Sequence, residues 1–91
     1  MPDRYRLRVA GPAARAVAKR LPEAAAAAVV EFMTGPLLDN PYKVGAVLGG
    51  PLQGTYAARR GSYRILYLVD DDEHLVTVRD VDHRADVYRR R

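Results

Sequence analysis

The chain has ninety-one residues, enough for a single domain spanning residues 1–91 and too few for a second hydrophobic core. It contains no cysteine, which excludes disulfides and thiolate metal sites. No window approaches the ~18 uninterrupted apolar residues that suggest a membrane span. The opening residues, MPDRYRLRVA, lack the apolar segment of a signal peptide, so we expect a cytoplasmic protein.

The charge is moderately basic, with 15 Lys+Arg against 11 Asp+Glu and a formal net charge of +4. All but two of the basic residues, Lys19 and Lys43, are arginine. Guanidinium groups bind phosphate bidentately, which favours a nucleic-acid partner. A genome rich in G and C also favours arginine and alanine codons, and the run Ala24 to Ala28 fits that alternative. The positions of the arginines must decide between the two.

The first part of the chain predicts a strand followed by a helical hairpin. Residues 5–9 alternate between apolar and basic side chains, as in a half-buried strand. Pro12 suits the first turn of a helix, and apolar residues then recur at helical spacing up to Leu21. Pro22 breaks this helix and opens a second one, which we expect Gly35-Pro36 to end.

The second part predicts mainly strands. Residues 37–51 form a loop with a short extended piece at 42–48, and the strands follow at 54–59, 62–69 and 75–81. Arg60-Gly61 and the acidic run 70–73 mark the two turns. Residues 85–91 form a short C-terminal helix or tail. This order predicts an α+β fold, with the helical hairpin packed on an antiparallel sheet of about four strands.

Charge is segregated along the strands. Four consecutive acids stand at 70–73, at one end of a hairpin, and Arg59 and Arg60 stand at the other. Arg89 and Arg90 add to the basic side from the C-terminal segment. This separation favours a polyanion-binding face, and we assign these four arginines to RNA contact. A solvated surface is the alternative.

Arg64 is the most informative single residue. It interrupts an otherwise apolar and aromatic run, between Tyr63 and Ile65, and points to the opposite face of its strand. An arginine at the centre of a strand is costly there unless it has a partner, such as Asp80, Asp82 or a bound phosphate. The choice between a structural ion pair and a phosphate site is open at this level.

A C-terminal group combines His83, Arg84 and Tyr88 within six residues. Scission of RNA through the ribose 2′-hydroxyl needs a base, a cation that stabilises the charged phosphorane, and an acid that protonates the leaving 5′-oxygen. Histidine, arginine and tyrosine can supply these functions. The alternative is a surface segment in which Asp86 pairs with the arginines that follow it.

Metal and cofactor chemistry has no support in the sequence. His74 and His83 are nine residues apart without a carboxylate at a recognised ligand spacing. Gly49-Gly50 and Gly54 form neither a dinucleotide-binding motif nor a phosphate-binding loop. We expect no metal and no cofactor.

Taken together, the blocks L-x-G-x-Y from Leu52, R-x-G-x-Y-R-x-x-Y from Arg59 and H-R-x-x-x-Y from His83 resemble the RelE toxins of the RelE/ParE superfamily. The order of strand, helices and strands matches as well, so the resemblance covers essentially the whole chain. It implies a RelE-like fold of the microbial ribonuclease type.

The resemblance implies a bacterial toxin that enters the A site of the 30S ribosomal subunit. There it cuts mRNA to a 2′,3′-cyclic phosphate without metal or cofactor. It further implies neutralisation by an acidic, RelB-like antitoxin that covers the C-terminal segment, and it allows a toxin–antitoxin heterotetramer. The strand arginine of the family falls on Arg64 and its C-terminal pair on Arg84 and Tyr88. Members with a histidine before that arginine use it in acid–base work, here His83.

One departure from the family pattern concerns the residues before the turn. Ala57 and Ala58 stand where some members carry lysine, and only Arg59, with Arg60 beside it, can take that role. The identity of the base for the 2′-hydroxyl therefore stays open. So do two other functions: a ParE-like toxin that inhibits gyrase by binding, and a non-catalytic RNA-binding or partner-binding domain.

Overall fold

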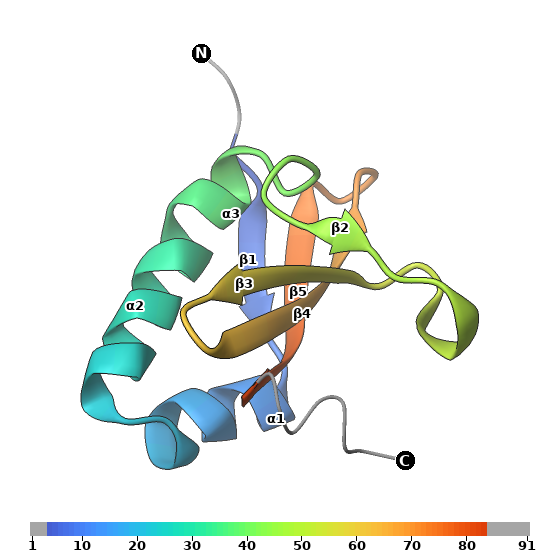
Figure 1. Cartoon of the computed structure of the whole chain (residues 1–91). Coiled ribbons are helices and arrows are strands. Elements are labelled where there is room, and N and C mark those ends of the chain that lie inside the picture. The colour runs from blue at the N-terminus through green and yellow to red at the C-terminus, as the bar shows by residue number, and fades with distance from the viewer. Residues whose placement is uncertain (1–3, 84–91) are drawn as a thin grey trace.

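The computed structural model describes residues 4–83, and residues 1–3 and 84–91 lie outside that description. Helices and strands follow one another in the order expected from the sequence, with short elements added between them (Figure 1). The elements are β1 (Arg6–Val9), α1 (Gly11–Arg15), η1 (Ala16–Arg20), α2 (Glu23–Thr34), α3 (Pro36–Asp39), β2 (Ala46–Val47), η2 (Gly50–Leu52), β3 (Tyr56–Arg60), β4 (Tyr63–Asp70) and β5 (Leu75–His83).

The strands form one sheet in the order β1-β5-β4-β3-β2. The α+β class is confirmed, but the expected antiparallel sheet of about four strands is a mixed sheet of five. β1 pairs with β5 in parallel, from Arg6 opposite Leu75 to Val9 opposite Val78. A parallel pair needs a long connection, which here is the rest of the domain between its first and last strands. The fifth strand, β2, is two residues long and lies within the extended piece predicted at 42–48.

The helical hairpin differs from prediction at two points. The first helix changes from an α-helix to a π-helical turn, η1, which the Leu21 N–H closes by donating to the Ala16 carbonyl at 3.0 Å. The expected stop at Gly35-Pro36 is followed at once by a new turn, α3, because Pro36 at its first position needs no N–H partner. Leu37 and Leu38 of this turn are buried, which fastens it to the core.

The core fills the space between the helices and one face of the sheet. Figure 1 shows α2 running along one side of the sheet, with α1 crossing near the end of β5. Alternate residues of the central strands point toward the helices, and no helix within residues 4–83 packs on the opposite face. We call this opposite surface the open face. The buried side chains include Ala13, Val29, Phe32, Met33, Leu37, Ile65, Tyr67, Val76, Val78 and Val81.

Tyr67 joins the sheet to the loop that precedes β2. Its fully buried hydroxyl donates to the Pro41 carbonyl at 2.7 Å, and burial raises the pKa of Tyr67 to about 12. Gly45 passes directly over this hydroxyl. A Cβ at Gly45 would overlap the Tyr67 oxygen and crowd the Ala57 carbonyl, so the close approach requires glycine.

The two turns of the main hairpin lie at opposite ends, as the sequence predicts. Gly61, with φ of +60°, supplies the left-handed residue of the tight turn between β3 and β4. At the other end, the Asp71 carboxylate accepts hydrogen bonds from the hydroxyls of Tyr5 and Tyr42, each at 2.7 Å. These two bonds lower the pKa of Asp71, Tyr42 contributing most. The acidic turn is thereby tied to the start of β1 and to the loop before β2.

Candidate active site

Arg59, Arg64 and Asp82 form a row across three neighbouring strands. Arg59 of β3 lies directly opposite Arg64 of β4, which in turn lies directly opposite Asp82 of β5. Directly opposite side chains share a face of the sheet, with Cβ atoms about 4.5–5.5 Å apart. Their neighbours Ile65 and Val81 face the core, so this row belongs to the open face. The interpretation of Arg64 as pointing away from the apolar side of its strand is confirmed.

The row carries two cations and one anion. Arg59 is exposed, Arg64 is half-buried and the side chain of Asp82 is only 3% exposed. Two like charges directly opposite each other repel. Two arginines on neighbouring strands suit an anion such as phosphate, whose oxygens accept charge-assisted hydrogen bonds from guanidinium groups. Arg64 can therefore pair with a carboxylate of the sheet and also bind a phosphate from the open face, so the two interpretations of this residue do not exclude each other.

A second row contains Arg60, Tyr63 and His83, again directly opposite one another on β3, β4 and β5. It lies on the side of the helices. The Arg60 guanidinium carbon sits 3.9 Å from the centre of the Phe32 ring, a cation–π contact. Arg59 and Arg60 therefore face opposite sides of the sheet, although the sequence grouped them as RNA contacts. Whether Arg60 also touches RNA stays a prediction.

His83 ends β5 and is exposed. Its ring meets Tyr63 edge-on, with ring centroids 5.3 Å apart and an interplanar angle of 87°. A hollow of about 230 Å³ adjoins it, lined by Arg20, Leu21, Tyr63, Val81, Asp82 and His83. The imidazole is thus accessible at the same end of the sheet as Arg59 and Arg64, although its row lies on the side of the helices and theirs lies on the open face.

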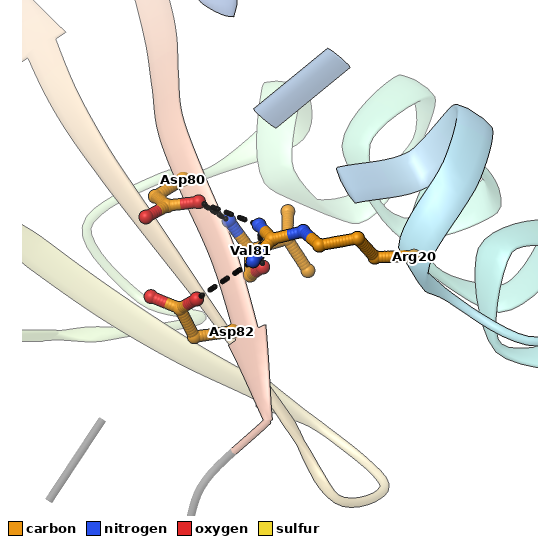
Figure 2. Close-up of polar contacts among 4 residues, drawn as sticks. All are labelled: Arg20, Asp80, Val81 and Asp82. Atoms are coloured by element: carbon orange, nitrogen blue, oxygen red, sulfur yellow. Dashed lines mark hydrogen bonds and ion pairs between the residues drawn. The ribbon is translucent and has the colours of Figure 1, made fainter. Parts of the chain in front are cut away.

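Arg20 is a residue of this region that the sequence did not single out. It leaves η1 and reaches the end of β5, where its guanidinium lies near Asp80, the Val81 carbonyl and Asp82 (Figure 2). The sequence places Arg20 on the outward side of a helix, sixty residues from these partners. No local motif carries such a contact, so only the tertiary structure could reveal it.

The other predicted site residues, Arg84, Tyr88, Arg89 and Arg90, lie outside the described residues, and their roles stay predictions. Within residues 4–83, no three histidine or carboxylate side chains converge as a candidate metal site. No helix in the same part of the chain has the length and apolar character needed to cross a membrane.

Comparison with known proteins gives the family. A model described as the ParE toxin of the type II toxin–antitoxin system parDE matches residues 3–88. The chain belongs to this family of toxins. Two curated members from Mycobacterium tuberculosis carry RelE-type names. Toxin RelE is 45% identical over 85 residues, covering 93% of this chain and 87% of its own length. Toxin RelG is 52% identical over 71 residues, covering 78% of this chain and 82% of its own length.

A solved structure gives the same result for the fold. The toxin–antitoxin complex RelBE2 from Mycobacterium tuberculosis contains a chain that superposes on this toxin with a TM-score of 0.84 and 46% identity. The superposition covers 91% of this chain and 94% of that one. The resemblance to RelE toxins of the RelE/ParE superfamily, stated on the motif residues, is confirmed, and with it the assignment to a type II toxin–antitoxin system.

Proposed function

We propose that this toxin is a metal-independent endoribonuclease that cuts mRNA in the ribosomal A site and so inhibits translation. The observation that carries the proposal is the row of Arg59 and Arg64 on the open face, at the end of the sheet where His83 emerges. Two neighbouring arginines on one face, with an exposed histidine at the same end of the sheet, suit the binding and cleavage of a phosphodiester. The RelE-type names of the 45% and 52% identical relatives point the same way.

The proposed reaction uses the RNA's own 2′-hydroxyl as the nucleophile. A base removes the 2′-proton, the 2′-oxygen forms a bond to phosphorus, and the bond from phosphorus to the 5′-oxygen breaks. An acid gives a proton to that leaving oxygen, so the products are a 2′,3′-cyclic phosphate and a 5′-hydroxyl. The charge on the phosphorane grows during this exchange, and preorganised cations stabilise it more than they stabilise the substrate.

Each residue has a stated part in this proposal. Arg64 binds the scissile phosphate, with Arg59 beside it on the neighbouring strand. Arg84 stabilises the transition state, and His83 and Tyr88 divide the acid and base roles. The assignments of Arg84 and Tyr88 come from the sequence motif, because both lie outside the described residues. Arg60, Arg89 and Arg90 are proposed to contact RNA away from the scissile bond.

Inhibition of DNA gyrase by binding is the second candidate function. The family model that matches this chain is described by its ParE toxin, which favours this alternative. A reconstituted translation reaction and a gyrase supercoiling reaction separate the two functions. Cleavage of mRNA only in the presence of ribosomes supports the first, whereas blocked supercoiling with intact mRNA supports the second.

We further propose that the partner is an acidic, RelB-like antitoxin acting in the cytoplasm, where mRNA and ribosomes are found. The related RelBE2 structure is a toxin–antitoxin complex, and the net charge of +4 here calls for an acidic covering segment. A heterotetramer of two toxins and two antitoxins is the assembly that we propose to test by mass measurement in solution.

Growth arrest on expression without antitoxin tests the site directly. Arg64→Ala and Tyr88→Phe should each relieve the arrest, because one removes the phosphate ligand and the other a proton donor. Arg79→Ala is the matched control, since Arg79 is an exposed arginine of β5 outside the two rows. Full toxicity of both site variants would overturn the residue assignments.

A further inference from the structure

We propose that Arg20 is a positioning residue for the cleavage site: from η1 it fixes the C-terminal end of β5 and the carboxylate that lies opposite Arg64. The inference rests on the proposed ribonuclease function, because a positioning role requires a reaction to serve. It adds a residue from the helical hairpin to a site otherwise built from strands and the C-terminal segment. The arrangement is drawn in Figure 2.

The edge of β5 is the first observation. β1 pairs with β5 only as far as Val78, and the Ala10 N–H donates the last bond of this ladder to the Val78 carbonyl at 2.9 Å. Beyond that point β5 continues to His83 paired with β4 on one edge, and its β1 edge has no strand beside it within residues 4–83. Arg20 occupies this edge, and its Nη2 donates to the Val81 carbonyl at 3.4 Å. The guanidinium thus takes the place of a strand on this one edge, while β4 pairs with the other edge.

The carboxylates on either side of Val81 are the second observation. Arg20 Nη2 lies 3.4 Å from Asp80 Oδ1, and Arg20 Nη1 lies 3.8 Å from Asp82 Oδ1. A single fork therefore spans three consecutive residues of the strand, as Figure 2 shows. An arginine can hold such a set because its planar group presents several donors in fixed directions, which lysine cannot do.

The burial of Asp82 links this contact to the phosphate-binding row. The side chain of Asp82 is only 3% exposed, and a buried carboxylate is costly unless a cation pairs with it. Arg20 supplies one such cation from the helices, and Arg64 lies directly opposite Asp82 in the ladder. The carboxylate thus has a guanidinium-bearing residue on two sides. Its position affects the direction in which Arg64 presents its own guanidinium to a phosphate.

The backbone of η1 is the third observation. Arg20 is the last residue of the π-helical turn, which is wider than an α-helical turn and changes the direction in which its side chain leaves the axis. Single π-helical turns are rare and occur frequently at functional sites. Arg15, one turn earlier, is also exposed and lies in the regular α-helical part. It provides a matched control for the removal of a helical arginine.

The kinetic test compares Arg20→Gln, Arg20→Lys and Arg15→Gln in the ribosome-dependent cleavage of mRNA. We expect Arg20→Gln to lower kcat on the order of 10–100-fold with little change in RNA affinity, since small displacements of reacting groups have effects of this size. Arg20→Lys should lose less activity than Arg20→Gln, because lysine keeps the positive charge but lacks the planar set of donors of the guanidinium. Arg15→Gln should cleave like the wild type. A loss confined to RNA affinity, or an equal loss in Arg15→Gln, would overturn the proposal.

A structural readout makes the test independent of activity. In NMR spectra of the free toxin, Arg20→Gln should shift the amide resonances of Asp80 to His83 and the His83 imidazole, and Arg15→Gln should not. If Arg20→Gln does not fold, Arg20→Lys serves for the same comparison. Unchanged β5 and His83 resonances would refute the role of Arg20 alone. A wild-type protein that cuts no RNA would instead contradict the proposed function.

Discussion

Gly45→Ala should destabilise the toxin through one identifiable collision. An added Cβ would overlap the Tyr67 hydroxyl and crowd the Ala57 carbonyl. The Tyr67 ring is fully buried and has nowhere to move without breaking its 2.7 Å bond to the Pro41 carbonyl. Loss of that buried hydrogen bond costs about 1–3 kcal/mol, and overpacking costs about as much again.

The expected decrease in the free energy of unfolding is therefore about 2–6 kcal/mol, a large part of the stability of a domain of this size. Denaturation by urea, followed by circular dichroism, measures it. Gly49→Ala is the control, because Gly49 has a φ of −106° and no heavy atom within 4 Å of an added Cβ. This control should change the stability by less than about 1 kcal/mol.

A double variant tests the assigned cause. Tyr67→Phe removes the hydroxyl that the new methyl group would meet, so Gly45→Ala should cost less in that background than in the wild type. A coupling of about 1 kcal/mol or more is expected between the two changes. The rescue is partial because the contact with the Ala57 carbonyl remains. Additive effects, or a Gly45→Ala protein as stable as Gly49→Ala, would refute this reasoning.

Three other predictions follow from the charges. The lowered pKa of Asp71 means that its carboxylate stabilises the fold fully above the unfolded value of about 4, and that this contribution disappears as pH falls through the lower folded value. Asp71→Asn should therefore flatten the acid limb of a plot of unfolding free energy against pH, and an unchanged limb would contradict the Tyr5 and Tyr42 bonds. Arg64→Lys should lower kcat for mRNA cleavage by about 10-fold or more, because an ammonium cannot bind phosphate as a fork, and Arg79→Lys should not. Antitoxin affinity, measured by calorimetry, should weaken from low to high salt, and a constant affinity would argue against an acidic covering segment.

The sequence predicts those parts of the fold that depend on local pattern. The alternation in residues 5–9, the helix opened by Pro22 and the Gly61 turn each reflect contacts between near neighbours, and each appears where expected. The parallel pairing of β1 with β5 depends on residues about seventy positions apart, and no periodicity records it. The π turn at η1 is not predicted from the sequence for the same reason, because it lies where the helix packs against β5, far away in the chain.

The residues of the candidate site also fall into those that a local sequence pattern predicts and those that only tertiary contacts reveal. Arg64 stands out in the sequence because a cation in an apolar strand needs a partner, and the ladder then places Asp82, one of the two predicted carboxylates, directly opposite. Arg59 and Arg60 look equivalent in the sequence, yet the alternation of the strand sends them to opposite faces. Arg20 carries no local signal, since its contacts join a helix to a strand sixty residues away.

The end groups of the cleaved RNA test the central claim most directly. Wild-type toxin, ribosomes and a defined mRNA would be combined in a purified translation reaction, and the fragments would be mapped and their termini identified. The account predicts fragments with 2′,3′-cyclic phosphate and 5′-hydroxyl ends, and their loss with Arg64→Gln but not with Arg79→Gln. Intact mRNA, or fragments that end in 3′-hydroxyl and 5′-phosphate, would contradict it.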